Sequence, residues 1–337
     1  MKLKFVKLNG LFFLILFVLF SCSKDPETII ETVEVVKEVE VTVTETVEVD
    51  PFADSTLEGV LTSDKTLSSD KIWLIKGRVV VGDGATLTIP AGTVIKAEPG
   101  SGADASTLII ARGGKIDAKG TASKPIIMTA KADNIQADGT YPSTGASLTV
   151  NSRGLWGGLL VLGKAPSSFK GDVSELQIEG IPVSDTNGLY GGSVSDDNSG
   201  TMQYISIRHG GAEIGEGNEI NGLTLGGVGS GTVIDHIEVI ANVDDGIEFF
   251  GGTVNASYLL VWGQGDDALD IDQAYSGTID DAYVILEDAS DHGMEIDGPE
   301  GSAAGSFTIK NVTIDGASKN GKALGVDGEI VKQCSDE

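Results

Sequence analysis

The chain has 337 residues, enough for one long domain or two of ordinary size. Its formal net charge of −27 at pH 7 argues against nucleic-acid binding, because a phosphate backbone requires a basic face. Such a charge indicates either a secreted or surface protein with cation sites or a protein that is simply well solvated. The 46 glycines against 9 prolines, with few aromatic residues, favour many tight turns between short strands.

The first residues have the order of a bacterial export signal. Three lysines before residue 8 precede an apolar run over residues 11–20, which is too short to span a bilayer comfortably. The run ends in Leu19-Phe20-Ser21-Cys22, which resembles the lipobox of bacterial lipoproteins. This resemblance implies that residues 1–21 are removed and that Cys22 becomes the acylated first residue, with palmitate attached. The alternative is an ordinary secretory signal in which Cys22 has no such role.

Residues 22–50 form a low-complexity segment in which valine alternates with glutamate and threonine. The period of two favours an extended strand, but one such segment cannot bury its own valine face. We expect a tether between the membrane and the body, with a stalk that pairs with a neighbouring chain as the alternative. The acidic stretch 23–27 resembles the export signal of surface lipoproteins in Bacteroidetes-type bacteria, which implies an outer-membrane protein facing the cell exterior. We assign no role to Cys334, the other cysteine.

The body, residues 51–337, is a series of short β-signals separated by glycine, aspartate and asparagine. Between residues 217 and 297 one motif occurs four times, with a small residue at the same step: Gly222, Gly246, Ala268 and Gly293. The offsets of 24, 22 and 25 residues predict an all-β solenoid, a right-handed parallel β-helix. Residues 131–200 interrupt the rhythm, so we expect longer loops there. An antiparallel β-sandwich would require frequent hairpin turns and no long-period register.

Alternation within the repeat separates inward from outward side chains. Two apolar columns should point inward: Leu223, Ile247, Leu269 and Met294, then Leu225, Phe249, Ile271 and Ile296. The residues between them should point outward: Thr224, Glu248, Asp270 and Glu295. A second column of short strands is expected to begin near Gln203, His236, Ser257, Ala282 and Asn311.

Four longer strings, beginning at Gly84, Leu108, Asn218 and Asp244, resemble signatures of Bacteroidetes cell-surface β-helix lipoproteins. The likeness covers roughly residues 55–300 and implies the fold and the cellular location. That family brings no agreed biochemical activity. Its members tend to continue further at the C-terminus, so we expect final coils or a cap beyond the present sequence.

The predicted register stacks carboxylates on successive coils about 4.8 Å apart. Two charges at this spacing repel by about 1 kcal/mol in water and by about 3.5 kcal/mol at an effective dielectric constant of 20. A bound cation, raised carboxyl pKa values or backbone N–H donors would relieve the repulsion. Ca²⁺, which binds six to eight oxygen atoms, is the candidate cofactor; capping of turns with screening by salt is the structural alternative. The candidate ligands are Asp244, Asp245, Glu248, Asp266, Asp267, Asp270, Asp291 and Glu295.

Three short motifs in the repeat, at Asn242, Gly265 and Asp291, are similar in order and spacing to motifs of polygalacturonase-type glycosidases. The resemblance implies catalytic carboxylates assisted by a histidine, which would be Asp245, Asp266, Asp267 and His292. The basic Arg-x-Lys of that family, which grips a uronate, is incomplete here because residues 308–310 read Thr-Ile-Lys. We therefore expect a binding, adhesive or structural role in the cell envelope, with a polysaccharide or a surface protein as partner. A uronate-type polysaccharide hydrolase is the alternative.

Overall fold

The computed structural model describes residues 52–145, 147–214 and 219–316. Within these ranges the chain forms β-strands and two short 3-10 turns, η1 (Gly102–Asp104) and η2 (Thr186–Gly188), without an α-helix. The described part contains no helix long and apolar enough to cross a membrane. The predicted signal peptide, Cys22, the tether and Cys334 lie outside the described residues, as does residue 51, the predicted start of the body.

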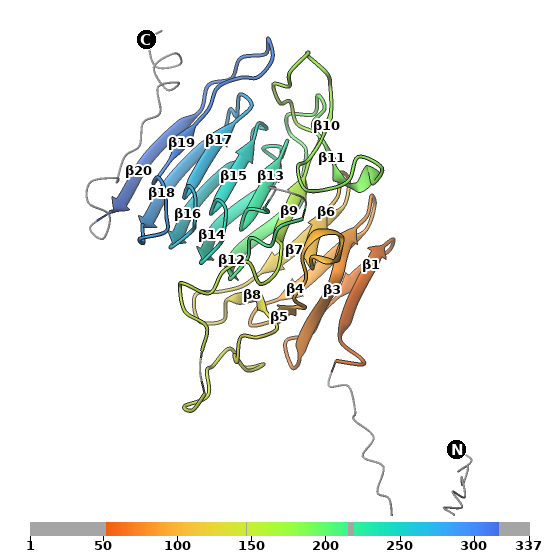
Figure 1. The fold of residues 1–337 in the computed structure, drawn as a ribbon. Coiled ribbons are helices and arrows are strands. Elements are labelled where there is room, and N and C mark those ends of the chain that lie inside the picture. Colours follow the sequence, from red (N-terminus) through yellow and green to blue (C-terminus); the bar gives the residue numbers. More distant parts are fainter. Residues whose placement is uncertain (1–51, 146, 215–218, 317–337) are drawn as a thin grey trace, which may run out of the picture. The chain divides into compact units, whose positions relative to one another are not determined.

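The strands wind into a right-handed parallel β-helix, which confirms the predicted fold class. Each coil contributes to three parallel sheets that surround one core, and Figure 1 shows the strands of successive coils lying side by side. Sheet A carries the fourfold repeat and pairs in parallel from coil to coil. It consists of the second halves of β1 (Thr56–Leu61) and β3 (Ile72–Val81), then β6 (Thr107–Ile110), β9 (Gly158–Leu162), β13 (Leu223–Gly226), β15 (Ile247–Phe250), β17 (Leu269–Asp272) and β19 (Glu295–Ile296).

Sheets B and C share five long strands, β12 (Gly200–Arg208), β14 (Val233–Ile240), β16 (Asn255–Trp262), β18 (Thr278–Ile285) and β20 (Thr308–Asp315). Their first halves continue sheet C from β2 (Lys65–Thr66), β4 (Thr86–Pro90) and β7 (Lys115–Lys119). Their second halves continue sheet B from the first halves of β1 and β3, then β5 (Val94–Ala97) and β8 (Ile126–Ala130). The sequence predicted strands mainly over the second halves and missed most of the first halves.

One residue in each long strand turns the chain from sheet C to sheet B. These corner residues have left-handed backbone angles, with φ between 50° and 57°, and fall outside the strand register: Tyr204, His236, Tyr258, Asp281 and Asn311. A left-handed conformation costs a non-glycine residue about 1 kcal/mol or more. Stacking offsets part of this cost, since the His236 ring lies 4.1 Å from Tyr204 and 4.4 Å from Tyr258, centroid to centroid.

The aliphatic columns predicted from the repeat form the core. Leu223, Ile247 and Leu269 are fully buried, whereas Met294 is only partly buried because its coil is the last one described in sheet A. The small residue before each strand has a packing reason. An added Cβ at Gly222 would lie 2.4 Å from the Val239 side chain, which is closer than real Cβ atoms approach. Each buried Leu or Ile contributes roughly 1.5–3 kcal/mol to folding.

A second apolar cluster lies on the outer side of sheet A. Loop residues there pack against outward side chains of β3, β6, β9 and β15. We call these loop residues the roof: Phe169, Ile178, Ile181, Tyr190, Ala212, Ile214 and Ile220. Four of them belong to the loop region predicted at 131–200, which also contains β10 (Leu176–Gln177) and β11 (Leu189–Tyr190). Thr224 and Glu248 therefore point outward as predicted but are buried rather than exposed.

Candidate cation and ligand site

The carboxyl groups of the repeat lie together on the outer face of sheet A and on the turns that enter it from sheet B. The register places Glu248 beside Asp270 and Asp270 beside Glu295 on neighbouring strands, as predicted. We call this group, together with Glu179 from the loop that covers sheet A, the acidic band. It comprises Glu179, Asp244, Asp245, Glu248, Asp266, Asp267, Asp270, Asp272, Asp291 and Glu295.

Two members of the band link successive coils through backbone hydrogen bonds. Asp245 Oδ1 accepts a hydrogen bond from the N–H of Asp267 at 2.9 Å, and Asp267 Oδ1 accepts one from the N–H of His292 at 2.6 Å. The two side chains are only 8% and 1% exposed. Backbone donors thus provide one of the expected forms of relief from repulsion, because each satisfies a lone pair of a carboxylate.

Carboxyl groups also pair with one another. Interaction with the Asp267 side chain is the largest cause that raises the pKa of Glu295, and interaction with Asp270 contributes to the raised pKa of Glu248. Two neighbouring carboxyl groups relieve their repulsion when one of them is protonated. The band therefore combines two of the expected forms of relief, backbone donors and bound protons.

Burial and mutual repulsion raise the pKa values of several carboxyl groups of the band. Burial is the main cause for Glu248 and Asp245, whose pKa values lie well above the ordinary range, with further repulsion from Asp270. Burial likewise raises the pKa of Asp270 to about 7 and that of Asp244 to about 6. The hydrogen bond to Asp267, followed by burial, raises the pKa of Glu295 to about 8. At neutral pH the band is consequently a partly protonated set of oxygen ligands.

Basic partners do not balance these charges. Asp291 aside, no lysine or arginine of the described ranges forms an ion pair with a member of the acidic band. A basic side chain that touches the band is His292, whose Nδ1 lies 3.0 Å from Asp267 Oδ1 and 3.8 Å from Asp291 Oδ2. An anionic ligand would thus meet repulsion unless a cation were bound between it and the band.

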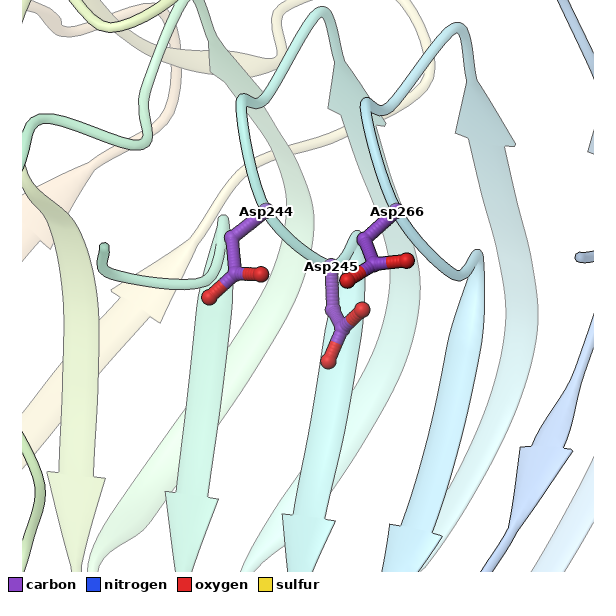
Figure 2. Close-up of side chains that lie close together, drawn as sticks. All are labelled: Asp244, Asp245 and Asp266. Carbon is purple, nitrogen blue, oxygen red and sulfur yellow. The ribbon is translucent and has the colours of Figure 1, made fainter. Parts of the chain in front are cut away.

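Two groups of three carboxylates have the spacing of a cation site. In Asp244, Asp245 and Asp266, one oxygen from each lies within 4.8 Å of the other two, and Figure 2 shows these side chains converging from two adjacent turns. The second group consists of Asp245, Glu248 and Asp270, so Asp245 belongs to both. Carboxylate oxygens in this arrangement suit hard cations such as Ca²⁺.

A buried amide adjoins the second group. Asn221 is 1% exposed, and its Nδ2 donates a hydrogen bond to Glu248 Oε2. Its Oδ1 is buried and has no hydrogen-bond partner among the described residues. Amide oxygens are also ligands for Ca²⁺, so Asn221 can add a neutral oxygen to the carboxylates beside it.

An open hollow of 420 Å³ lies over the turns that carry Asp244, Asp266 and Asp291. Glu219, from the preceding turn, lines one part of it, and Ser290 lines another. The volume lies in the range of small-molecule sites, about 300–1,000 Å³. Asp245 and Asp267 do not line the hollow, since they lie deeper against the sheet.

The four residues of the glycosidase alternative are close in space but differ in accessibility. Asp266 is exposed and His292 is half-buried, whereas Asp245 and Asp267 are buried and accept backbone hydrogen bonds. His292 contacts Asp267 directly, and Asp245 lies within 4.8 Å of Asp266 between carboxylate oxygens. Lys310, from the incomplete basic motif, instead pairs with Asp280 on sheet C at 2.7 Å.

Sequence reasoning missed three acids of this region. Glu179 comes from the roof loop. Its pKa is raised to about 7, first by loss of hydration and then by repulsion from Asp244, Asp272 and Glu219. Asp272, at the end of β17, has a pKa raised to about 7, mainly by burial. The repeat gave a signal for Asp272, which follows Asp270 by two positions and so points the same way. Loop residues such as Glu179 and Glu219 have no register from which to place them.

Comparison with protein families gives a match over residues 59–328 to a pectate-lyase-like beta-helix domain. The matched region includes every member of the acidic band and the roof. Comparisons with curated proteins and with solved structures give no match. The family match and the fold are consistent with a carbohydrate-related role.

Proposed function

The chain belongs to the pectate-lyase-like β-helix family, and on this premise we propose that it is a carbohydrate-binding surface protein whose acidic band takes up Ca²⁺. One observation carries the proposal: two groups of three carboxylates share Asp245 and have the oxygen spacing of a cation site. A cation there would replace protons held at raised pKa values. It would also reverse the local charge seen by a ligand.

The accessible edge of the band suits a carbohydrate. Asp244 and Asp266 line the open hollow, so a cation held by them would keep coordination positions facing solvent. Sugar hydroxyl or carboxylate oxygens can fill such positions, because Ca²⁺ accepts six to eight oxygen ligands of mixed origin. Nucleic acid is disfavoured as a partner by the net charge of −27.

The melting temperature with and without Ca²⁺ tests the cation. We expect Ca²⁺ to raise the melting temperature of the purified chain, because a ligand that binds only the folded state stabilises it. Asp245→Asn should abolish this rise, since it removes a ligand from both groups. Asp117→Asn is the matched control, because Asp117 lies on β7 in sheet C. Equal rises in both variants would contradict the proposed site.

A polysaccharide panel tests the ligand. We expect at least one uronate or neutral polysaccharide to bind the chain in Ca²⁺, and the binding to disappear with a chelator or with Asp266→Asn. Binding that persists in the chelator and in Asp266→Asn would show that the ligand binds elsewhere on the protein. Failure of every polysaccharide to bind would contradict a carbohydrate ligand.

The location is part of the same proposal. Cys22 would carry the lipid, and the segment at 22–50 would hold the β-helix away from the outer membrane, on the cell exterior. The lipobox resemblance supports this location. Labelling with a palmitate analogue should be lost in Cys22→Ser and kept in Cys334→Ser. Equal labelling of both variants would contradict acylation at Cys22.

The hydrolase alternative has one favourable observation, the contact of His292 with Asp267 beside carboxyls whose pKa values lie near 6–8. A general acid needs such a pKa to remain protonated at neutral pH. Release of reducing ends from polygalacturonate, lost in Asp266→Asn but kept in Asp117→Asn, would establish the enzyme and demote the binding role. Binding without any product would leave the binding proposal in place.

A further inference from the structure

From its second coil onward, the outer row of sheet A changes from covered to uncovered along the solenoid. One residue from each coil stands in this row, paired with the next through the parallel register. After Val60 on the first coil, which is 50% exposed, they are in order Val80, Ile109, Leu160, Thr224, Glu248, Asp270 and Glu295. The first five are at most 6% exposed, whereas Asp270 and Glu295 are half-buried. Beyond the first coil, the described part of the sheet face is thus accessible only over its last two coils.

The cover over the earlier coils consists of two loops that contact each other. Ile178 and Ile181 from one loop share an apolar cluster with Ala212, Ile214 and Ile220 from the other. The two loops touch where a Cβ added to Gly180 would lie 3.3 Å from the Cβ of Ile214. Apolar contacts between these described loop residues and the sheet bury the outward side chains under this bridge.

The roof is also fixed firmly to the sheet. The Phe169 ring meets the Tyr190 ring edge to face, with centroids 5.2 Å apart, and Tyr190 packs in turn on Phe250. The Tyr190 hydroxyl donates a hydrogen bond of 2.8 Å to the buried Gln273 side chain. Aromatic pairs of this kind add about 0.5–1.5 kcal/mol to the free energy gained from burial.

A second wall closes the side of the band away from the hollow. The N–H of Gly301 donates to Ser168 Oγ at 3.0 Å, and the N–H of Ser302 donates to Asp172 Oδ1 at 2.6 Å. The N–H of Ser168 donates to the carbonyl of Gln273 at the end of sheet A. These bonds join residues 168–172 to residues 301–302 beside the band, so a ligand that crosses the strands also meets protein.

We propose that the acidic band is a blind-ended site that binds the end of a carbohydrate chain rather than an internal stretch. This inference rests on the proposed carbohydrate-binding function. A chain lying along the solenoid would advance about 4.8 Å for each coil. It would stop where the face closes at Glu248, with Glu179 beside Gly180 at the edge of the bridge. The rest of the chain would leave over the hollow and the last two coils.

Chain length in the ligand tests the inference without altering the roof. The probes are polygalacturonate in Ca²⁺ and a neutral galactan, each used intact and as a partial digest at the same total sugar concentration. Saturation of a blind-ended site depends on the concentration of chain ends. Cutting each chain into ten fragments should therefore lower the half-saturation point, expressed as total sugar, by about tenfold. Saturation of a groove that is open at both ends depends on the concentration of internal sugar units. Its half-saturation point would therefore stay unchanged or rise.

The outcomes separate the two proposals. A lower half-saturation point for the digest of either probe supports end binding. Equal or weaker binding of the digest overturns end binding and leaves carbohydrate binding intact. Absence of binding by all four preparations overturns both. Modification of the reducing end with 2-aminobenzamide adds a second readout, because a blind-ended site should accept only chains whose entering end is free.

Discussion

The outer face of sheet A consists of two regions that share one backbone register and differ in side chains. Over the early coils the outward residues are apolar, as in Ile109 and Leu160, and loops fold back to cover them. Over the last coils they are acidic, as in Asp270 and Glu295, and the face stays accessible. The register therefore determines where a side chain points. The polarity of that side chain determines whether the face becomes core or binding surface.

The difference has an energetic origin. Apolar surface gains about 25 cal/mol for each Å² removed from water, so an apolar outer row stabilises the loop that covers it. A carboxylate loses hydration when covered and must take up a proton, a donor or a cation in exchange. Glu248 lies at the boundary, where burial and the neighbouring Asp270 raise the pKa of its carboxyl. Substitutions on either side of this boundary should act in opposite directions.

The largest effect is expected in the covered region. Phe169→Ala removes a fully buried ring that packs on Tyr190, and comparable substitutions cost about 3–5 kcal/mol. Thermal or denaturant unfolding should show this loss, while Ca²⁺ should still raise the melting temperature of the variant. A melting temperature equal to that of the wild type would mean that the roof does not stabilise the fold.

The acidic region should respond to pH. Asp270, Asp272 and Glu295 have folded-state pKa values of about 7, 7 and 8, above those of the unfolded chain. The folded state therefore keeps protons that the unfolded chain releases near pH 4, and stability falls as pH rises from about 4 to 8. The summed loss should be on the order of 3 kcal/mol after allowance for solvent screening. Unfolding in a chelator, measured across this range, checks the sign.

Calcium should reverse that loss. At pH 8 Asp270 and Asp272 are mostly ionised and available, so Ca²⁺ should restore most of the stability lost since pH 5. At pH 5 the same Ca²⁺ concentration should have little effect, because protons occupy the ligands. A calcium effect of equal size at both values would contradict the competition between protons and metal.

A single substitution should sharpen the comparison further. Glu248→Gln keeps an N–H donor toward Asp270 and removes a carboxyl whose pKa is raised by burial. We expect it to raise stability by about 1–2 kcal/mol at pH 8 without Ca²⁺, because an uncharged amide is less costly to bury. The same variant should lose much of the calcium response. If Glu248→Gln were less stable than the wild type at pH 8 in chelator, the ionised Glu248 carboxylate would stabilise the folded state, contrary to this prediction.

The smallest effect belongs to an acid outside the band. Asp117 pairs with Lys119 on the exposed face of sheet C, at 2.6 Å. Exposed ion pairs contribute at most about 1 kcal/mol, so Asp117→Asn should change stability little and leave the calcium response unchanged. A calcium response reduced as strongly as in Asp245→Asn would mean that net charge, not the site, binds the metal.

The repeat allowed much of the fold to be predicted. Its period identified the solenoid, and its alternation placed Leu223 and Ile247 inside and Glu248 and Asp270 outside, because inward packing fixes a strand's register. The same alternation brought most of the acidic band together. It also identified the step at Gly222, although the packing reason required the position of Val239 from a different sheet.

The rest of the fold and of the site could not be predicted, because it depends on contacts between segments that are distant in the sequence. Ile178 and Ile214 lie in loops, where no periodic pattern marks the face that a side chain will cover. The burial of Glu248 and the proximity of Glu179 both follow from these loops. The corner at Tyr204 could not be predicted either. Residues other than glycine rarely adopt left-handed backbone angles, and nothing local in the sequence distinguishes this tyrosine.

Proton release on calcium binding tests the central claim most directly. When Ca²⁺ is titrated into the full chain near pH 7, the band should bind it saturably and release protons from carboxyls such as Asp270 and Glu295. The heat of binding should then depend on the buffer's ionisation enthalpy, and Asp245→Asn should abolish both binding and proton release. Absence of saturable binding, or binding in Asp245→Asn with unchanged proton release, would contradict a cation site in the acidic band.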